Sequence, residues 1–262
     1  MGRLCCSFDD ERLHPKTFPR TTDSQVKPLN LLLASSSRCY PHEYLDHIES
    51  AVKELFQGCQ RVIFIPYARP GGASHSDYSQ AACQRFSRMQ IPMLGIEQYS
   101  SPSEAIEQAD GVFVGGGNTF VLLKTLYEHQ LVGLLRERVC RGMPYMGTSA
   151  WSNIAGLTIG TSNDMPIVYP PSFEALSLVP ININPHFPTS APDPTFKGET
   201  RQERITEFHH ENRQPVLGLT EEAWLRVKGD EMIHHGDRDA TFFRAEQDPQ
   251  ACQPESNIAK ML

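Results

Sequence analysis

Residues 111–120 read Gly-Val-Phe-Val-Gly-Gly-Gly-Asn-Thr-Phe, an apolar run that leads directly into three glycines. The run at 111–114 carries no charge and predicts a strand. Glycine lacks a Cβ, so the loop at 115–117 allows the backbone to approach a ligand closely, and Thr119 is a suitable cap for a following helix. The stretch therefore predicts a strand, a glycine loop and a helix in succession.

Strand and helix patterns alternate on both sides of this stretch. Continuous apolar runs predict strands, and apolar residues at three- and four-residue spacing predict helices. Because helices separate successive strands, we expect a mainly parallel sheet with helices on both faces, which is an α/β fold. The expected strands are 29–34, 61–67, 92–96, 111–114 and 144–146, and the expected helices are 44–55, 77–89, 103–109 and two within 119–141.

The remainder of the chain is expected to close the same domain. Prolines are dense at 166–194, which predicts irregular loops interrupted by a short strand at 179–183. A helix at 199–211 and four closely spaced strands at 216–244 follow, and they predict a small antiparallel C-terminal part. The expected organisation is a flexible N-terminal extension at 1–28, a single α/β domain at 29–247 and a flexible tail at 248–262.

The composition argues against several classes of protein. The chain has 24 basic and 31 acidic residues and a net charge of −7, which does not suit a surface that follows nucleic-acid phosphates. No apolar stretch approaches the roughly 18–20 residues of a membrane span, and the N-terminal part lacks the apolar core of a secretory signal. The seven cysteines form neither an even disulfide set nor a CxxC zinc pair. We expect a cytoplasmic protein with no nucleic-acid or membrane partner.

The sequence Gly-Thr-Ser-Ala at 147–150 lies between the strand at 144–146 and an apolar stretch that can form a helix. A serine at such a turn exposes its hydroxyl, and the N-terminus of the helix supplies free amides for a developing oxyanion. Ser149 is therefore a candidate nucleophile. The alternative is that Thr148 or Ser149 simply caps the helix.

The glycine loop does not match a nucleotide-binding motif. G-x-G-x-x-G would need glycine where Phe120 stands, and the Gly-Lys-Ser/Thr ending of a Walker loop is absent. The loops that follow neighbouring parallel strands lie at the same edge of the sheet. The amides of this loop can therefore instead contribute to an anion or oxyanion site beside Ser149. A plain tight turn is the alternative.

A serine nucleophile requires a histidine base and a carboxylate that orients it. Of the ten histidines, His186 lies in Asn-Ile-Asn-Pro-His-Phe at 182–187, where a strand ends in a rigid proline turn. Two adjacent histidine pairs, at 209–210 and 234–235, lack the spacing of a metal-ligand set, and we expect no metal site. His186 is the preferred candidate, and a hydrogen-bonded loop histidine is the alternative.

Five segments, in order and at matching spacing, resemble the peptidase E family, the serine α-aspartyl dipeptidases, whose relatives include the cyanophycinases. The segments are GGGNTF, GTSA, TSNDMPIVYPP, INPHF and GETRQERI, and the resemblance covers roughly residues 29–245. It implies a fold similar to the class I glutamine amidotransferases and hydrolysis of dipeptides with an N-terminal aspartate, without a metal or an organic cofactor. The expected partner is a small acidic dipeptide substrate, and a homodimer stays open.

The resemblance also implies roles for individual residues. Ser149 matches the nucleophile, His186 matches the histidine of the family's NPHF motif, and Glu221 matches the acid that completes the triad. Glu222 is one residue away, and Asp164 is an alternative third member.

The resemblance assigns the substrate contacts as well. The amides of Gly117 and Ala150 match the oxyanion donors. Arg201 is the candidate cation for the aspartyl carboxylate, since planar bidentate pairing suits a carboxylate. The other residues expected to bind the substrate or to shape its site are Gly116, Asn118 and Asp164.

Trp151 departs from the family pattern, which has glycine two residues after the serine. Glycine lets the helix pack closely on its strand, so the indole is expected to swing into the active-site mouth or to displace the helix. It could also point toward a neighbouring chain or a widened pocket and leave the enzyme working. The alternative function is therefore a catalytically impaired family member that binds acidic peptides or a protein partner.

Overall fold

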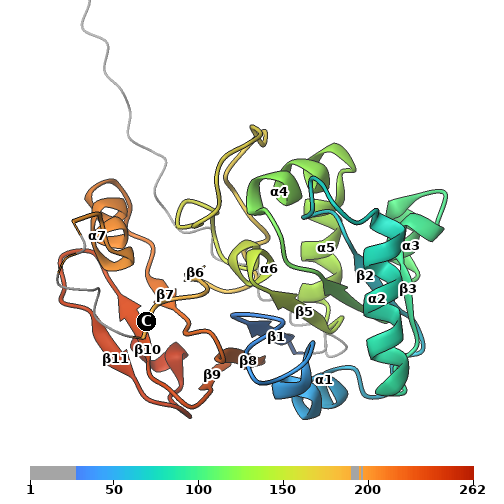
Figure 1. The fold of residues 1–262 in the computed structure, drawn as a ribbon, viewed down its shortest axis with the longest axis horizontal. Coiled ribbons are helices and arrows are strands. Elements are labelled where there is room, and N and C mark those ends of the chain that lie inside the picture. The colour runs from blue at the N-terminus through green and yellow to red at the C-terminus, as the bar shows by residue number, and fades with distance from the viewer. Residues whose placement is uncertain (1–27, 190–194, 196) are drawn as a thin grey trace, which may run out of the picture.

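The computed structural model describes residues 28–189, 195 and 197–262. The extension predicted at 1–28 lies outside the described residues, apart from Pro28. Two sheets stand beside each other in this part of the chain, the main sheet on the right of Figure 1 and a smaller one on the left.

The main sheet has seven strands among the described residues, in the order β3-β2-β4-β5-β1-β8-β9. Strands β3 to β1 of this order pair in parallel, and β8 and β9 extend the sheet in antiparallel fashion beyond β1. Full burial of β2 and β4 explains their continuous apolar runs. The strands are β1 (Asn30–Ala34), β2 (Val62–Ile65), β3 (Met93–Gly95), β4 (Gly111–Val114), β5 (Tyr145–Thr148), β8 (Trp224–Lys228) and β9 (Glu231–His235).

Helices cover both faces of this sheet, as predicted. Leu31 and Leu33 of β1 point into the apolar cluster of α3 to α6, while Leu32 and Ala34 point into that of α1 and α2. None of the described helices combines the length and the apolar character that a bilayer span requires. The helices are α1 (Glu49–Leu55), α2 (His75–Arg88), α3 (Pro102–Glu107), α4 (Thr119–Glu128), α5 (Leu131–Cys140) and α6 (Ala150–Ile154), and η1 (Asp46–Ile48) and η2 (Ile96–Gln98) are 3-10 turns.

The second sheet has the order β11-β10-β7-β6 and packs against α7 through Ile205, Val216 and Phe243. The expected antiparallel C-terminal strands are thus divided between two sheets: β8 and β9 join the main one, β7 and β10 the second. Sequence closeness could not indicate this division, because it is decided by partners far along the chain: β8 pairs with β1, and β7 pairs with β6. The elements are β6 (Asn182–Asn184), α7 (Arg201–Glu211), β7 (Val216–Gly218), β10 (Ala240–Phe243) and β11 (Gln250–Cys252).

The prediction of a flexible tail at 248–262 is wrong. The segment contributes β11, which pairs with β10, and the 3-10 turn η3 (Ile258–Met261), which lies against β9. Ile258 is completely buried and Cys252 nearly so. The mixed polarity of the segment concealed this, because so short a strand and turn contain too few apolar residues for a periodic pattern.

Replacement of Ile258 by alanine tests the buried tail. Because its side chain has no solvent exposure, Ile258→Ala should lower the free energy of unfolding by about 2–5 kcal/mol in denaturant titrations. Lys260→Ala, at an exposed position of the same turn, is the control and should change it by less than about 0.5 kcal/mol. Equal effects of the two changes would show that the tail does not pack as described.

Candidate active site

The candidate residues meet at the carboxyl edge of the main sheet. The glycine loop at 115–117 follows β4, Ser149 follows β5, and Ser35 and Ser36 follow β1. Strands β4, β5 and β1 are neighbours in the parallel part of the sheet, so the segments that leave them lie together.

Ser149 occupies a strained turn between β5 and α6. Its backbone has φ 58° and ψ −119°, a conformation that non-glycine residues rarely adopt. Its amide donates to the Ala34 carbonyl at 3.1 Å, and its side chain makes no capping hydrogen bond to α6. The hydroxyl is therefore free to face the neighbouring loops, and the capping alternative does not describe Ser149.

Ser149, His186 and Glu221 form a continuous hydrogen-bonded chain. Ser149 Oγ lies 2.8 Å from His186 Nε2, and His186 Nδ1 lies 2.5 Å from Glu221 Oε2. With the imidazole proton on Nδ1, His186 donates to the carboxylate and accepts from the serine hydroxyl. This polarity is the one that a general base for Ser149 requires.

Two buried serines after β1 hold the histidine and the acid in place. The His186 backbone has φ 56°, and its amide donates to Ser35 Oγ at 2.7 Å. Ser35 Oγ in turn donates to the Leu219 carbonyl at 3.1 Å, and Ser36 Oγ donates to the Glu221 carbonyl at 2.8 Å. The loop after β1 thus fixes two of the three members.

Glu221 is the carboxylate that pairs with His186. The hydrogen bond from His186 lowers the pKa of Glu221 below its usual value near 4.5, and burial only partly opposes this effect. Asp164 instead accepts from the backbone amide and the hydroxyl of Thr119 at 2.7 and 2.6 Å, so it caps α4. Glu222 makes no ion pair among the described residues. The two alternative third members are therefore not placed against the histidine.

The glycine loop approaches Ser149 closely. A Cβ at Gly116 would lie 3.3 Å from Ser149 Cβ, and one at Gly117, which has φ 153°, would lie 2.2 Å from the Ala68 carbonyl oxygen. The Gly117 amide donates to no group of the described residues, and Ala150, as the first residue of α6, has no acceptor within its helix. Both amides are available to a ligand.

The side chain of Asn118 is engaged by the protein. Its Oδ1 accepts from the amides of Phe120 and Val121 at 3.1 Å, and its Nδ2 donates to the Met165 carbonyl at 2.9 Å. Asn118 and Asp164 therefore both shape the start of α4 and tie the loop at 160–166 to it. Asn118 thus supports the glycine loop, and Asp164 lies between this loop and the residues that follow it at 165–166.

Arg201 lies at a cavity of about 260 Å³ beside this loop. Among the described residues its Nη1 is buried and has no hydrogen-bond partner, and burial lowers the pKa of its guanidinium group. Asn184 Oδ1 is likewise buried and unpartnered. The cavity therefore offers one unpaired cationic donor and one unpaired acceptor. Its lining residues are Gly160, Thr161, Ser162, Asn163, Asp164, Met165, Pro166, Asn184, Arg201, Arg204, Ile205 and Phe208.

A model of peptidase family S51 matches residues 31–235, the part of the chain that holds this arrangement. The chain belongs to peptidase family S51. A peptidase E of Streptomyces coelicolor is 43% identical over 234 residues, which cover 89% of this chain and 95% of that protein. A probable alpha-aspartyl dipeptidase of Drosophila melanogaster is 42% identical over 236 residues, covering 89% of this chain and 97% of that protein. The predicted resemblance to the peptidase E family is confirmed.

Solved structures support the fold of this S51 peptidase. A putative peptidase E from Listeria monocytogenes aligns with a TM-score of 0.59 at 23% identity, over 79% of this chain and 98% of that one. A peptidase from an acI-B1 actinobacterium aligns with a TM-score of 0.68 at 18% identity, over 89% and 98%. At such identities the likeness concerns the fold alone, and it confirms the predicted α/β class, similar to glutamine amidotransferases.

Trp151 does not enter the mouth of the S51 site, contrary to the prediction. The residue is fully buried in the apolar cluster on the α6 face of the main sheet, away from solvent and from any neighbouring chain. Close packing of α6 on its strand depends instead on Gly147, where a Cβ would lie 2.8 Å from the Trp151 carbonyl. The close contact between strand and helix is provided by Gly147 in the strand. Position 151 can therefore carry a large side chain, which points into the apolar cluster.

Three residues of the site were missed in the sequence: Ser35, Ser36 and Asn184. The signal for the two serines was present, because they follow an expected strand at the same sheet edge as Ser149. Asn184 lies within the INPHF segment, but only the folded chain shows that its Oδ1 is buried without a partner.

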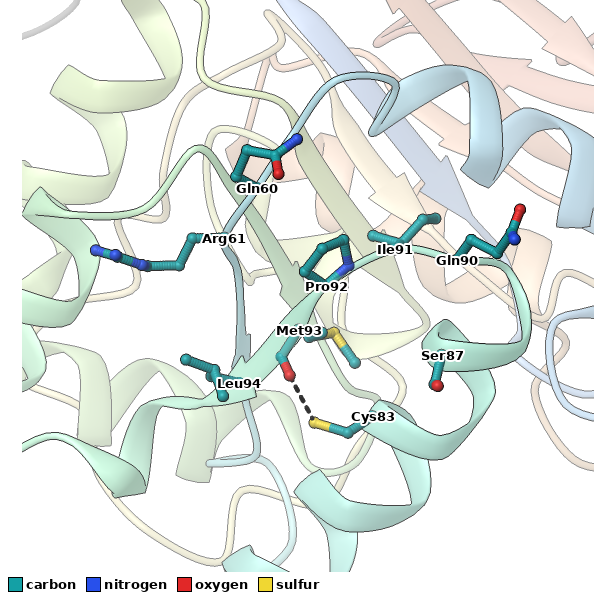
Figure 2. Close-up of a pocket in the computed structure, with 9 residues that line it drawn as sticks. All are labelled: Gln60, Arg61, Cys83, Ser87, Gln90, Ile91, Pro92, Met93 and Leu94. Carbon is teal, nitrogen blue, oxygen red and sulfur yellow. Dashed lines mark hydrogen bonds between the residues drawn. The ribbon is translucent and has the colours of Figure 1, made fainter.

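A larger hollow of about 550 Å³ lies at the opposite edge of the sheet, where β2 and β3 begin (Figure 2). Within it, Cys83 Sγ donates to the Met93 carbonyl at 3.4 Å. The lining contains no histidine and no carboxylate, so it offers no acid–base pair for hydrolysis by this S51 peptidase. The lining residues are Gln60, Arg61, Cys83, Ser87, Gln90, Ile91, Pro92, Met93 and Leu94.

Stability at low pH tests the link between His186 and Glu221. The folded pKa of Glu221 is lowered, so its contribution to stability is present above the unfolded value near 4.5 and is lost as pH falls through the folded pKa. Denaturant titrations should therefore show Glu221→Gln less stable than wild type at pH 6, by at most about 1 kcal/mol for this half-exposed group, with the gap closing toward pH 3. Glu222→Gln is the control, and a gap that does not depend on pH would contradict the link.

Proposed function

We propose that this S51 peptidase is a serine dipeptidase that hydrolyses dipeptides with an N-terminal aspartate. The observation that carries the proposal is the hydrogen-bonded chain of Ser149, His186 and Glu221, together with a cavity at which Arg201 Nη1 has no partner among the described residues. The name of the Drosophila relative, a probable alpha-aspartyl dipeptidase, agrees with the proposal.

Hydrolysis begins when Ser149 Oγ attacks the main-chain carbonyl carbon of the aspartyl residue, in the bond to the second residue. His186 Nε2 takes the hydroxyl proton, and Glu221 stabilises the resulting imidazolium. The amides of Gly117 and Ala150 donate to the oxyanion of the tetrahedral intermediate. His186 then gives its proton to the leaving amine, an acyl-enzyme remains on Ser149, and water attacks it by the reverse route to release aspartate.

The cavity lined by the loop at 160–166 supplies the preference for aspartate. Arg201 Nη1, which has no hydrogen-bond partner among the described residues, donates to the side-chain carboxylate of the substrate. Asn184 Oδ1, an acceptor without a donor, accepts from the α-ammonium group. When the first residue of the substrate is uncharged, no anion pairs with the buried Nη1 of Arg201. A buried charge without a partner lowers the affinity for such a substrate.

No observation favours the alternative of an impaired enzyme that only binds acidic peptides or a protein. That alternative rested on Trp151 in the site mouth, and the indole is buried in the core. We further propose the cytoplasm as the location, since the odd cysteine count suits a reducing compartment. A homodimer stays a prediction.

Release of free aspartate from Asp-Leu measures the proposed activity. Wild type should cleave it, and Ser149→Ala should lose about four or more orders of magnitude in kcat. Trp151→Phe should stay active despite some loss of stability, because the indole contacts the core and not the substrate. An inert wild type, or an active Ser149→Ala, would refute the proposal.

The preference for aspartate tests Arg201. Arg201→Gln should lower kcat/KM for Asp-Leu about 100-fold while leaving that for Asn-Leu nearly unchanged, because only the charged side chain loses a partner. Arg213→Gln is a suitable control, since Arg213 is exposed and pairs with Glu246 outside the cavity. A proportional loss on both substrates would assign Arg201 a structural role only.

A further inference from the structure

Two arginines at the carboxyl edge of the main sheet take no part in the site described so far. Arg38 follows β1, Arg69 follows β2, and both side chains are exposed. Neither belongs to an ion pair of the described residues. At the sheet edge where Ser149 also lies, two guanidinium groups are thus without an anionic partner among the described residues.

The two arginines lie over the same pair of phenols. The guanidinium carbon of Arg38 is 5.6 Å from the centre of the Tyr44 ring, and that of Arg69 is 4.0 Å from the centre of the Tyr78 ring. Burial raises the pKa of both phenols, and the positive charges of both arginines act against this rise. Each guanidinium group therefore lies within electrostatic range of both rings. The hydroxyl of Tyr44 is itself buried without a hydrogen-bond partner.

Direct contacts connect Arg69 to the oxyanion site. The preceding carbonyl, of Ala68, accepts from the Asn118 amide at 2.7 Å and lies against Gly117. Tyr78, beneath the guanidinium group, donates its hydroxyl to the Gly116 carbonyl at 3.2 Å. The residue before Arg69 therefore contacts the loop whose amide would bind the oxyanion.

Arg38 is connected to the other side of the site. Ser36 Oγ makes hydrogen bonds with the carbonyls of both Arg38 and Glu221, at 3.1 and 2.8 Å. The loop that positions the triad acid thus also positions Arg38. Ser149 lies between the segments that carry the two arginines, because β5 stands between β2, which Arg69 follows, and β1, which Arg38 follows.

The arginines and the aspartate cavity lie in different layers. Tyr44 and Tyr78 belong to the apolar cluster of α1 and α2, whereas the loop at 160–166 is tied to the start of α4, in the other cluster. With the aspartyl side chain at Arg201 and the scissile bond at Ser149, the layer that carries Arg38 and Arg69 is the one left for the second residue. One extended residue spans about 3.5 Å, so the C-terminal carboxylate of a dipeptide follows the scissile bond closely.

We propose that Arg38 and Arg69 together bind the C-terminal carboxylate of the dipeptide and so restrict the enzyme to substrates with a single residue after aspartate. The inference rests on the proposed dipeptidase function. Planar guanidinium groups suit a carboxylate, and an amide or a continuing chain at the same place offers them no charge.

The test compares kcat/KM for Asp-Leu and for Asp-Leu amide, which differ only in the charge of the C-terminus. Wild type should prefer the free acid by about tenfold or more, as expected for a charge-assisted contact near solvent. The double variant Arg38→Gln/Arg69→Gln should cleave both substrates at the rate that wild type shows for the amide, while Arg69→Lys should keep part of the preference. Arg141→Gln, an exposed arginine of the same charge paired with Glu137, is the matched control.

Binding to Ser149→Ala separates this inference from the proposed function. Calorimetry should show Asp-Leu bound about tenfold more tightly than Asp-Leu amide, with the difference abolished when Arg38→Gln and Arg69→Gln are added. This result supports the carboxylate site even if wild type proves inert, in which case only the hydrolytic proposal fails. Equal binding of acid and amide, or a preference that survives the double variant, would overturn the inference and leave aspartate release as an independent result.

Discussion

The close approach of α6 to β5 fixes Ser149, the proposed nucleophile. At Gly147 the strand leaves no space for a Cβ against the Trp151 carbonyl, and the Tyr145 hydroxyl donates to that same carbonyl at 3.1 Å. Ser152 Oγ adds a hydrogen bond of 2.6 Å to the Ala34 carbonyl, which ties α6 to β1 as well. These contacts over-determine the turn, so Ser149 can keep a backbone conformation that an isolated chain would avoid.

The hydrogen-bonded chain of the candidate site depends on two sheets being held together. Ser149 follows β5 of the main sheet, whereas His186 follows β6 of the second sheet, and Glu221 lies in the connection from β7 to β8. Ser35 and Ser36 join these parts, since their hydroxyls bond to the amide of His186 and to the carbonyl of Glu221. A change that loosens the contact between the sheets would separate His186 and Glu221 from Ser149 without altering any of the three residues.

Features that a few consecutive residues determine could be predicted from the sequence. The strand at 111–114, the glycine loop after it and the turn at Ser149 are encoded within a few residues each, and the structure has them where expected. The direction of the Trp151 side chain, the burial of Ile258 and the partners of β7 depend on segments far along the chain. Neither periodicity nor propensity contains that information, so these features became visible only in the folded molecule.

The position of β1 in the main sheet ties the candidate site to strands that lie far apart in the sequence. Strand β1 pairs with β5 on one side and with β8 on the other, and β8 is followed by β9, against which the turn η3 packs (Figure 1). Pairings of such long sequence separation cost loop-closure entropy and slow folding. Ser149 follows β5, whereas Glu221 lies just before β8, so β1 brings the two segments together by pairing with both strands. The candidate site and the closed core of the main sheet therefore form through the same pairings of β1.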